Sequence, residues 1–373
     1  MSPYMRSLSP QGKGGRRSCR TVYCVFAAAA IFAFLFWTPL PRAYDRQREE
    51  ITKQVSETTK GFAWHNSHAE ASLKNTKSKY AFATLLAADS EHPDDPDNLH
   101  DDYFIATRLL GYQLMHAPET RSEGIPFIAM ATKKVSEAKL DRLRRDGAIV
   151  LVVDTVEKPE WITEGAPNWS ELFDKLRLWE LTQFERIAFL DGDTVLNRPL
   201  TNIFNDTAVG LHHTLDRPDK VKPDEDPLPS TYVFAGQPEM NFAHHYPPTD
   251  AAHDYPNINY LNGGFFVMQP SLELQHYYLS LMQLPNRFPP KLQEQNLLNY
   301  AHRREGEGGN MPWVQLDPQW NIHYPTMADL EGGVASLHEK WWAPVDAELK
   351  PYLLSWRWRM EGFYEAMDAA RRV

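Results

Sequence analysis

The chain has 373 residues, a formal net charge of −10 at pH 7 and 42% hydrophobic residues. This length can bury a substantial core and suits one large domain or two small ones. An acidic chain without a basic patch disfavours nucleic acid as a partner, because phosphate backbones recruit Lys and Arg. The two cysteines, Cys19 and Cys24, lie at or within an N-terminal apolar segment, so no disulfide framework can form in the rest of the chain.

Residues 21–38 form an uncharged apolar run that is near the minimum length for a bilayer span. A cleaved signal peptide is the alternative, but the run is longer than usual, and Pro39 and Pro41 occupy the expected cleavage region. We predict a cytoplasmic tail at 1–20, a signal-anchor at 21–38, a stem at 39–79 and one lumenal domain at 80–373. A cytoplasmic N-terminus is favoured by the basic residues Arg6, Lys13, Arg16, Arg17 and Arg20. Two sequons, at Asn168 and Asn205, agree with a lumenal location.

From residue 80 onward, short apolar runs alternate with amphipathic stretches. The alternation predicts an α/β domain with a mostly parallel sheet covered on both faces. In such folds ligands bind beyond the carboxyl ends of the strands. The expected strands are 80–86, 125–130, 148–153, 186–190 and 260–268. The expected helices are 103–115, 170–182 (with Ser170 as N-cap), 271–284 and 292–303. The expected loops are 89–102, 216–229 and 247–256.

Three Asp-x-Asp patterns occur, beginning at Asp95, Asp191 and Asp224. The first and third lie in polar, Pro-rich stretches, where solvated charge is the simpler interpretation. Only Asp191-Gly192-Asp193 directly follows an apolar strand. Paired carboxylates there could hold a hard cation through oxygen ligands, with Gly192 allowing a close turn. The alternative is that one carboxylate caps the next segment.

Other polar residues could complete this site. Lys175 lies on the amphipathic stretch before the strand, and Lys340 follows His338 near the C-terminal end. His338 could add an imidazole ligand, although a single histidine is more often a satisfied polar residue.

Taken together, these segments resemble family 8 glycosyltransferases, the group that includes glycogenin and galactinol synthase. Residues 184–196 resemble the family's metal-binding strand and loop, and 175–179 resemble the Lys-x-x-x-Trp helix before it. Residues 261–267 are similar to the Asn-x-Gly strand, 293–299 to the Asp-Gln-x-Leu-Leu-Asn helix, and 338–341 to the closing His…Lys-Pro-Trp motif. The motifs keep their order across residues 80–342.

The resemblance implies a single GT-A-type nucleotide-sugar-binding domain and a role for each matching residue. Asp191, Asp193 and His338 would bind Mn²⁺ or Mg²⁺, and Lys340 would contact the donor diphosphate. Asp191, Lys175, Asn262 and Gly263 would contact the donor sugar or phosphate, and Gln295 and Glu294 would lie at the reacting centre. The uracil and ribose would be held by Thr84, Leu85 and Tyr103.

The implied activity is retaining transfer of glucose or N-acetylglucosamine from a UDP-sugar to a glycan acceptor. Two residues depart from the family pattern: Lys291 replaces an acidic residue, and Glu294 replaces Asp. Both departures affect the inferred identity of the donor sugar more than that of the nucleotide. The predicted anchor and expanded loops look more like fungal Golgi N-acetylglucosaminyltransferases, which implies a type II Golgi membrane protein. Two alternatives remain open. One is a non-catalytic binding protein on the same fold. The other is a haloacid-dehalogenase-type phosphatase, because residues Asp191–Val195 resemble the nucleophile loop of that family.

Overall fold

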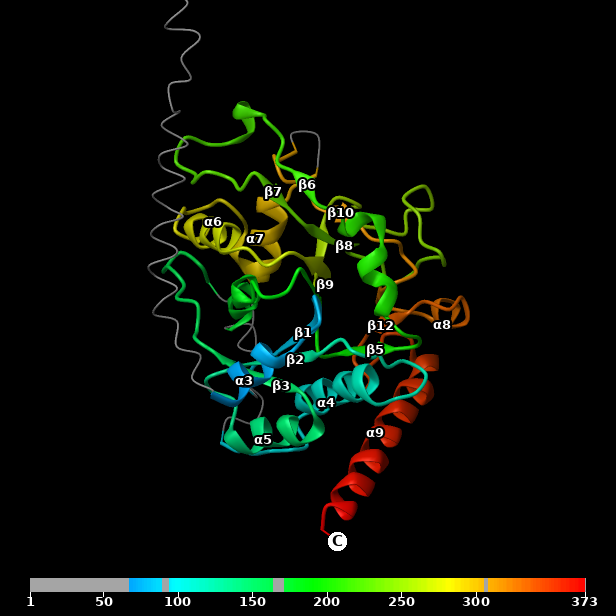
Figure 1. Ribbon diagram of the computed structural model, residues 1–373. Coiled ribbons are helices and arrows are strands. Elements are labelled where there is room, and N and C mark those ends of the chain that lie inside the picture. The colour runs from blue at the N-terminus through cyan, green and yellow to red at the C-terminus, as the bar shows by residue number, and fades with distance from the viewer. Residues whose placement is uncertain (1–66, 89–93, 164–170, 305–307, 373) are drawn as a thin grey trace, which may run out of the picture. The chain divides into compact units, whose positions relative to one another are not determined.

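The computed structural model describes residues 67–88, 94–163, 171–304 and 308–372 (Figure 1). The predicted tail, the predicted anchor, most of the stem and the Asn168 sequon lie outside these residues. Within the described ranges, no helix is both long enough and apolar enough to cross a bilayer. Asn205 is exposed, at the end of a short 3₁₀ helix.

A seven-stranded sheet forms the centre of the domain, in the order β10-β8-β9-β4-β1-β2-β3. Strand β9 is antiparallel to both neighbours, and the other neighbouring pairs are parallel, so the predicted mixed, mostly parallel sheet is confirmed. Every residue of β2 and β9 is buried, as expected for strands covered on both faces. The strands are β1 (Tyr80–Leu86), β2 (Phe127–Thr132), β3 (Ile149–Val153), β4 (Arg186–Leu190), β8 (Phe234–Pro238), β9 (Leu261–Met268) and β10 (Val314–Gln315).

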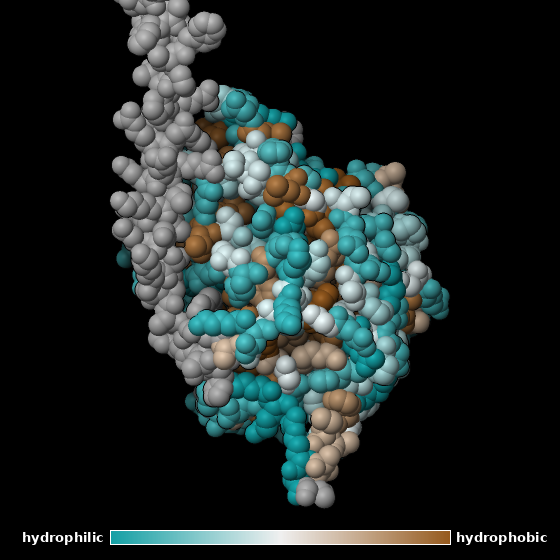
Figure 2. Space-filling view, in the orientation of Figure 1, coloured by the Kyte–Doolittle hydropathy of each residue, from teal (hydrophilic) through white to brown (hydrophobic). Residues whose placement is uncertain are grey.

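Helices cover both faces of this sheet (Figure 1). One buried cluster joins the sheet to the 3₁₀ helix η3 (Leu172–Glu180) and to α6 (Leu272–Met282) and α7 (Gln293–Ala301), with Trp179 at its centre. The cluster on the other face includes side chains of α4 (Asp102–Met115) and α5 (Glu137–Asp146). On the face drawn in Figure 2, hydrophobic areas are small and interspersed among hydrophilic residues.

Smaller elements complete the described part of the domain. Strands β11 and β12 are parallel and β12 is antiparallel to β5, and a separate antiparallel pair joins β6 to β7. The bounds are α3 (Ser67–Asn75), β5 (Thr194–Leu196), η4 (Thr201–Asn205), η5 (Thr207–Val209), β6 (His212–His213), η6 (Pro218–Lys220), β7 (Thr231–Tyr232), η7 (Pro290–Leu292), β11 (Ile322–His323), α8 (Met327–Glu331), β12 (Ser336–His338), η8 (Ala347–Leu349) and α9 (Lys350–Ala370).

Helices α3, α5, α8 and α9 were not predicted, and one predicted helix has a different form. Helix α5 has Ser136 as its N-cap and a left-handed Gly147 at its end, which are both sequence-level signals. Helix α9 buries Leu353, Trp356, Met360 and Tyr364 at helical spacing. The stretch 170–182 forms the 3₁₀ helix η3 and not an α-helix, with Glu171 at its N-cap position; Ser170 lies outside the described residues.

A cluster of charges fastens α9 to α4 and α5. The carboxylate of Asp146, at the end of α5, lies 2.6 Å from Arg108 Nε of α4 and 2.5 Å from Arg142 Nη2. Arg142 also pairs with Asp368 of α9. Because Asp146 is almost fully buried, this cluster is less screened than a surface ion pair.

The long β8–β9 connection, 239–260, is held at several points. The Asp254 carboxylate accepts hydrogen bonds from the backbone N–H groups of His245 (3.0 Å) and Thr249 (2.7 Å). His244 Nε2 lies 3.0 Å from Asp329 Oδ2, and both side chains are fully buried. Burial lowers the pKa of His244, but the hydrogen bond and charge of Asp329 outweigh burial and raise it. At pH values below this raised pKa, a charged imidazolium therefore fixes this connection to α8.

Replacing His244 with Ala should destabilise the protein in a pH-dependent way. Because the folded pKa of His244 is raised, its contribution is fully present below the ordinary value of about 6.5 and is lost as the pH rises through the folded pKa. We expect His244→Ala to lower the free energy of unfolding by about 1–3 kcal/mol near pH 5.5, and by less near pH 9. Urea denaturation measures both values, with exposed His100→Ala as control. Equal losses at the two pH values would contradict the ion pair.

Candidate functional site

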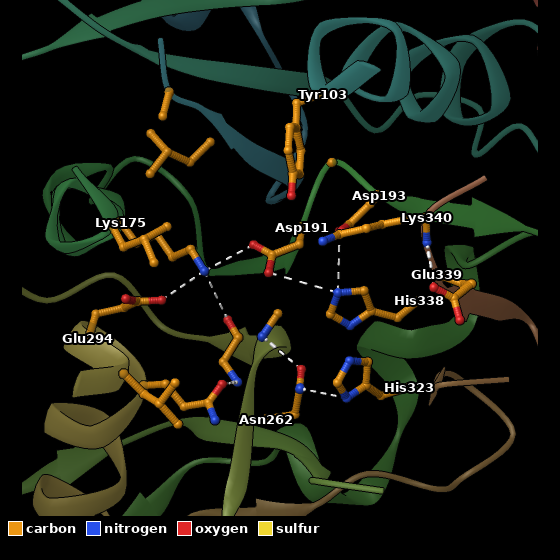
Figure 3. Close-up of a pocket in the computed structure, with 18 of the residues that line it drawn as sticks. Tyr103, Lys175, Asp191, Asp193, Asn262, Glu294, His323, His338, Glu339 and Lys340 are labelled. Atoms are coloured by element: carbon orange, nitrogen blue, oxygen red, sulfur yellow. Dashed lines mark hydrogen bonds and ion pairs between the residues drawn. The ribbon is translucent and has the colours of Figure 1, made fainter. Parts of the chain in front are cut away.

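A cavity of about 780 Å³ opens where β1 and β4 end and β9 begins (Figure 3). Asp191 directly follows β4, and its backbone N–H donates to Gly264 O at 2.8 Å. Because β9 runs antiparallel to β4, its first residues lie beside the end of β4. The structure therefore brings Asp191-Gly192-Asp193 and Asn262-Gly263-Gly264, which are far apart in sequence, to one edge of the sheet. The lining includes all the predicted site residues except Thr84.

Asp191, Asp193 and His338 lie together in the cavity, with one potential ligand atom of each within 4.8 Å of the others. His338 Nε2 is 3.3 Å from Asp193 Oδ1 and 3.9 Å from Asp191 Oδ2. The antiparallel pairing of β12 with β5 places His338 opposite Thr194, next to Asp193. Two carboxylates and an imidazole at this separation form a donor set suited to a divalent cation.

The pKa shifts of this group show strong electrostatic coupling. Burial lowers the pKa of His338, but the hydrogen bond and charge of Asp193 outweigh burial and raise it. Burial raises the pKa of Asp193, but the hydrogen bond and charge of His338 outweigh burial and lower it. Each group thus favours the charged form of the other, which compensates for their burial.

Gly264 leaves the space that this group occupies. A Cβ at position 264 would lie 2.2 Å from His338 Cε1 and 2.6 Å from Asp191 Oδ2, distances at which atoms overlap. Within the described part of the chain, the buried Nδ1 of His338 has no hydrogen-bond partner. These two observations show that the backbone is shaped around the imidazole and the carboxylates, and they fit a cation site.

Lys175 joins the Asp191 loop to α7. Its ammonium lies 3.0 Å from Asp191 Oδ1 and 2.8 Å from Glu294 Oε1, and it donates to Gly263 O at 3.4 Å (Figure 3). The Lys175 and Glu294 side chains are only 4% and 3% exposed. Burial lowers the pKa of Lys175, but the charges of Asp191 and Glu294 outweigh burial and raise it. The lysine therefore stays charged and compensates both carboxylates.

Asn262 and Gln295 organise the start of β9. Asn262 Oδ1 accepts from Gly264 N–H at 2.9 Å, and Gln295 Oε1 accepts from Gly263 N–H at 2.7 Å. Their amide nitrogens both donate to Glu239 Oε2, at 3.1 Å and 3.4 Å respectively. Two residues of the predicted site are thereby linked by a carboxylate that the sequence analysis did not single out.

Glu239, His323 and Tyr324 are cavity residues that the sequence analysis missed. Glu239 directly follows β8, and its position after a strand was the available signal. Its carboxylate bonds to His323, whose ring lies 4.7 Å from that of His338. Burial raises the pKa of Glu239, but its interactions with His323, Asn262 and His338 together outweigh burial and lower it. His323 and Tyr324 lie in and after a two-residue strand, too short to show an alternating pattern.

Lys340 and Tyr103 occupy another wall of the cavity. Lys340 Nζ lies 5.6 Å from the centre of the Tyr103 ring, which packs edge-on against Trp342 at 5.1 Å. Burial lowers the pKa of Lys340, but its interactions with Tyr103, Asp193 and Glu339 together outweigh burial and raise it. The main chain next to Lys340 is fixed because Glu339 N–H donates to Asp193 O at 2.9 Å. A cation and an aromatic ring thus lie close to the paired aspartates.

Two residues named from the sequence lie away from the cavity surface. Thr84 is fully buried within β1 and does not line the cavity, whereas its neighbour Leu85 does. Lys291 is exposed in η7, and Leu292 lines the cavity instead. Successive residues of a strand or turn direct their side chains differently, so a shift of one residue decides whether a side chain lines the cavity.

Comparisons with known proteins point to one class. The chain is 24% identical to galactinol synthase 2 of Arabidopsis thaliana over 181 residues, covering 47% of this chain and about half (50%) of that protein. Together with the mixed α/β fold and the cavity, this similarity supports a glycosyltransferase of family 8 with a GT-A fold. No family model matches the chain.

Two proteins of Schizosaccharomyces pombe are similar over a greater length. The uncharacterized protein C4C3.09 is 30% identical over 308 residues, covering 75% of this chain and 76% of that protein. The uncharacterized protein C5H10.12c is 27% identical over 338 residues, covering 83% and 85%. The chain belongs to the same family as C4C3.09.

Among solved structures, the chain is similar to two glycosyltransferases at low scores. Mouse xyloside xylosyltransferase 1 in its apo form has a TM-score of 0.42 and 16% identity, covering 69% of this chain and 97% of that one. GlyE of Streptococcus pneumoniae TIGR4, also in its apo form, has a TM-score of 0.44 and 11% identity, covering 77% and 64%.

Replacing Lys175 with Met should strongly destabilise the protein. The substitution leaves the buried Glu294 carboxylate without its cation, which typically costs about 3–5 kcal/mol. Combining Lys175→Met with Glu294→Leu should recover part of that loss, because the uncompensated charge is removed. Chemical denaturation at neutral pH measures both. Lys79→Met is the control, since Lys79 and its partner Glu185 are both exposed at the surface. A single Lys175→Met variant as stable as the wild type would refute the compensating role.

Proposed function

We propose that the protein is a metal-dependent, retaining glycosyltransferase that moves glucose or N-acetylglucosamine from a UDP-sugar to a glycan acceptor. The observation that carries the proposal is the convergence of Asp191, Asp193 and His338 in a cavity that also holds the ammonium groups of Lys175 and Lys340. A nucleotide-sugar needs its diphosphate charge balanced as the bond to the sugar breaks. The similarity to galactinol synthases supports the same class of reaction.

The proposed metal site consists of Asp191, Asp193 and His338, which would hold Mn²⁺ or Mg²⁺ (Figure 3). Carboxylates suit both ions, and the imidazole favours Mn²⁺ over the harder Mg²⁺. A bound cation would supply positive charge next to the leaving diphosphate.

The donor nucleotide would lie against Leu85 and Tyr103. The Tyr103 ring lies beside Lys340 in the cavity, so a uracil stacked on it would direct the diphosphate toward the ammonium of Lys340. Lys340 remains protonated because its pKa is raised. Thr84 would act only through the backbone of β1, since its side chain lies outside the cavity surface.

The donor sugar would lie between the start of β9 and α7, beside Asn262, Gly263, Glu294 and Gln295. Glu294 is bound to Lys175, and the Gln295 amide is held by Gly263 and Glu239. We favour front-face transfer, in which the acceptor hydroxyl attacks from the leaving-group side and a diphosphate oxygen takes its proton. Isolation of a covalent glycosyl intermediate on Glu294 or on Glu239 would contradict this mechanism.

The two alternatives are less well supported. In a haloacid-dehalogenase-type phosphatase the nucleophile loop follows the first strand, whereas the Asp191 loop follows β4 after three earlier strands of the same sheet. A non-catalytic binding protein would have no need for Gln295 and Glu239 to be held beside the proposed sugar position.

The proposed location is the Golgi membrane, with the catalytic domain, residues 80–373, lumenal and the chain anchored through residues 21–38 as a type II protein. This part of the proposal is supported by the uncharged run at 21–38 and by the basic residues before it.

The purified lumenal part should hydrolyse UDP-N-acetylglucosamine or UDP-glucose slowly in the presence of Mn²⁺. We expect a chelator to abolish UDP release, and Asp193→Asn to reduce its rate by about 100-fold or more because charge at the leaving group is lost. Asp224→Asn is the matched control, from an Asp-x-Asp pattern in an exposed loop. The proposal fails if no UDP-sugar is hydrolysed while p-nitrophenyl phosphate is, with loss of that activity in Asp191→Asn.

A Gly264→Ala substitution should weaken cation binding by more than about tenfold, since the new methyl group displaces His338 and Asp191. Gly362→Ala is the control, because a Cβ at position 362 meets open space in α9. Calorimetric titration with Mn²⁺ measures the affinity of each variant. Unchanged Mn²⁺ affinity in Gly264→Ala would argue against a cation site at these residues.

A further inference from the structure

An exposed aromatic side chain lies at the mouth of the cavity. Phe242, in the β8–β9 connection, lines the cavity and is nevertheless 63% exposed. Its ring centre is 4.4 Å from that of Tyr324, with an angle of 55° between the rings. Together they form a rim, which we call the Phe242–Tyr324 platform. Ligand pockets are lined predominantly by hydrophobic and aromatic side chains, so an aromatic pair at the mouth of a cavity is a candidate binding surface.

The platform is continuous with the proposed metal site. Tyr324 stacks on His323, with ring centres 3.6 Å apart and an angle of 28°. His323 in turn lies 4.7 Å from His338, at 31°. A row of four rings therefore runs from the proposed cation ligand to the mouth of the cavity. A ligand on the platform would lie next to the reacting centre.

The backbone is anchored on both sides of Phe242 and is strained at Tyr324. Phe242 lies between Asn241, whose N–H donates to Asp254 O at 2.9 Å, and His244, which is paired with buried Asp329. Tyr324 has a φ of 55°, in the left-handed region that a bulky residue rarely adopts. Anchors on both sides of an exposed ring, and strain beside its partner, indicate a site and not an incidental loop.

We propose that the Phe242–Tyr324 platform is the acceptor subsite and that it binds the apolar face of a pyranose ring in an oligosaccharide acceptor. The inference rests on the proposed transferase function and adds to it the acceptor class and the residues that bind it. The donor would occupy the inner cavity, from Tyr103 to Glu294. The acceptor ring would then enter from the opposite side, with a hydroxyl directed past His323.

The chemistry of the rim favours a sugar over a lipid or a hydrophobic peptide. A pyranose has a C–H face that packs on an aromatic ring and hydroxyl groups that bond to polar neighbours. Tyr324 directly follows His323, which is bonded to the Glu239 carboxylate, so acceptors for hydroxyls lie beside the rings. Among the described lining residues, Phe242 and Val345 are the exposed large hydrophobic side chains. Two such side chains suit the single C–H face of a sugar ring better than a long acyl chain.

The test uses the full chain and the probes chitobiose, cellobiose and mannobiose, with UDP and Mn²⁺ present. Saturation-transfer NMR measures binding without turnover, and transfer from the preferred UDP-sugar gives the KM for the acceptor. We expect at least one disaccharide to bind, and Phe242→Ala to weaken its affinity and raise its KM by about tenfold. Phe242→Tyr should restore most of the affinity, because it keeps the ring. Trp358→Ala is the control, removing an equally exposed aromatic from α9 outside the cavity lining.

Two results would overturn the inference. One is an affinity in Phe242→Ala within twofold of the wild type. The other is that none of the disaccharides binds or accepts a sugar while the wild type hydrolyses its UDP-sugar, which would indicate a peptide or lipid acceptor. Failure of the wild type to hydrolyse any UDP-sugar would instead refute the proposed function, and the NMR measurement still tests the platform.

Discussion

The cavity depends on one compensated charge, the buried ammonium of Lys175. Asp191, Asp193, Glu239 and Glu294 all line the same cavity, and carboxylates in a low-dielectric space repel one another strongly. Lys175 compensates Asp191 and Glu294, His338 pairs with Asp193, and His323 is hydrogen-bonded to Glu239. Since Asp191 extends from the end of β4 and Glu294 from the start of α7, the same ion pairs also fix the two sides of the cavity relative to each other.

The direction of the strands determines which residues lie beside Lys175 and the Asp191 loop. A strand parallel to β4 would place its C-terminal end beside Asp191. Because β9 is antiparallel to β4, it places its N-terminal residues there instead. Asn262, Gly263 and Gly264 therefore meet the Asp191 loop, and the absence of side chains on the glycines leaves room for Gln295 on one side and His338 on the other. The short β5–β12 pairing places His338 beside Asp193, although the two residues are more than 140 positions apart in the sequence. The mixed character of the sheet is thus a requirement of the site.

The cavity has a polar interior and an aromatic mouth, and the two are built by different means. The interior relies on strand ends, which are rigid and close to the core. The mouth relies on the long β8–β9 connection, which needs the His244–Asp329 and Asp254 contacts to keep one conformation. The inner and outer parts of the cavity therefore depend on different segments of the chain, which agrees with the proposed separation of donor chemistry from acceptor recognition.

The sequence by itself determined the strands with continuous apolar character and the chemistry that follows them. Tyr80–Leu86 and Arg186–Leu190 were predicted with the bounds that the structure gives, because mostly buried strands form short, predominantly apolar runs. The ordered motifs also indicated Lys175, Asp191, Asn262, Gln295, His338 and Lys340, which the structure brings together. The glycosyltransferase class followed from that order, and the similarity to galactinol synthases supports it.

Only the tertiary structure decided which side chains face the cavity and what lies at its mouth. Thr84 and Lys291 do not line it, whereas Glu239, His323, Tyr324 and Phe242 do, although no local pattern separates these two groups. Their positions depend on strand pairing and loop anchoring between segments far apart in the chain. Periodicity reports the burial of a residue within its own element, whereas the distance between side chains of different elements is set by packing.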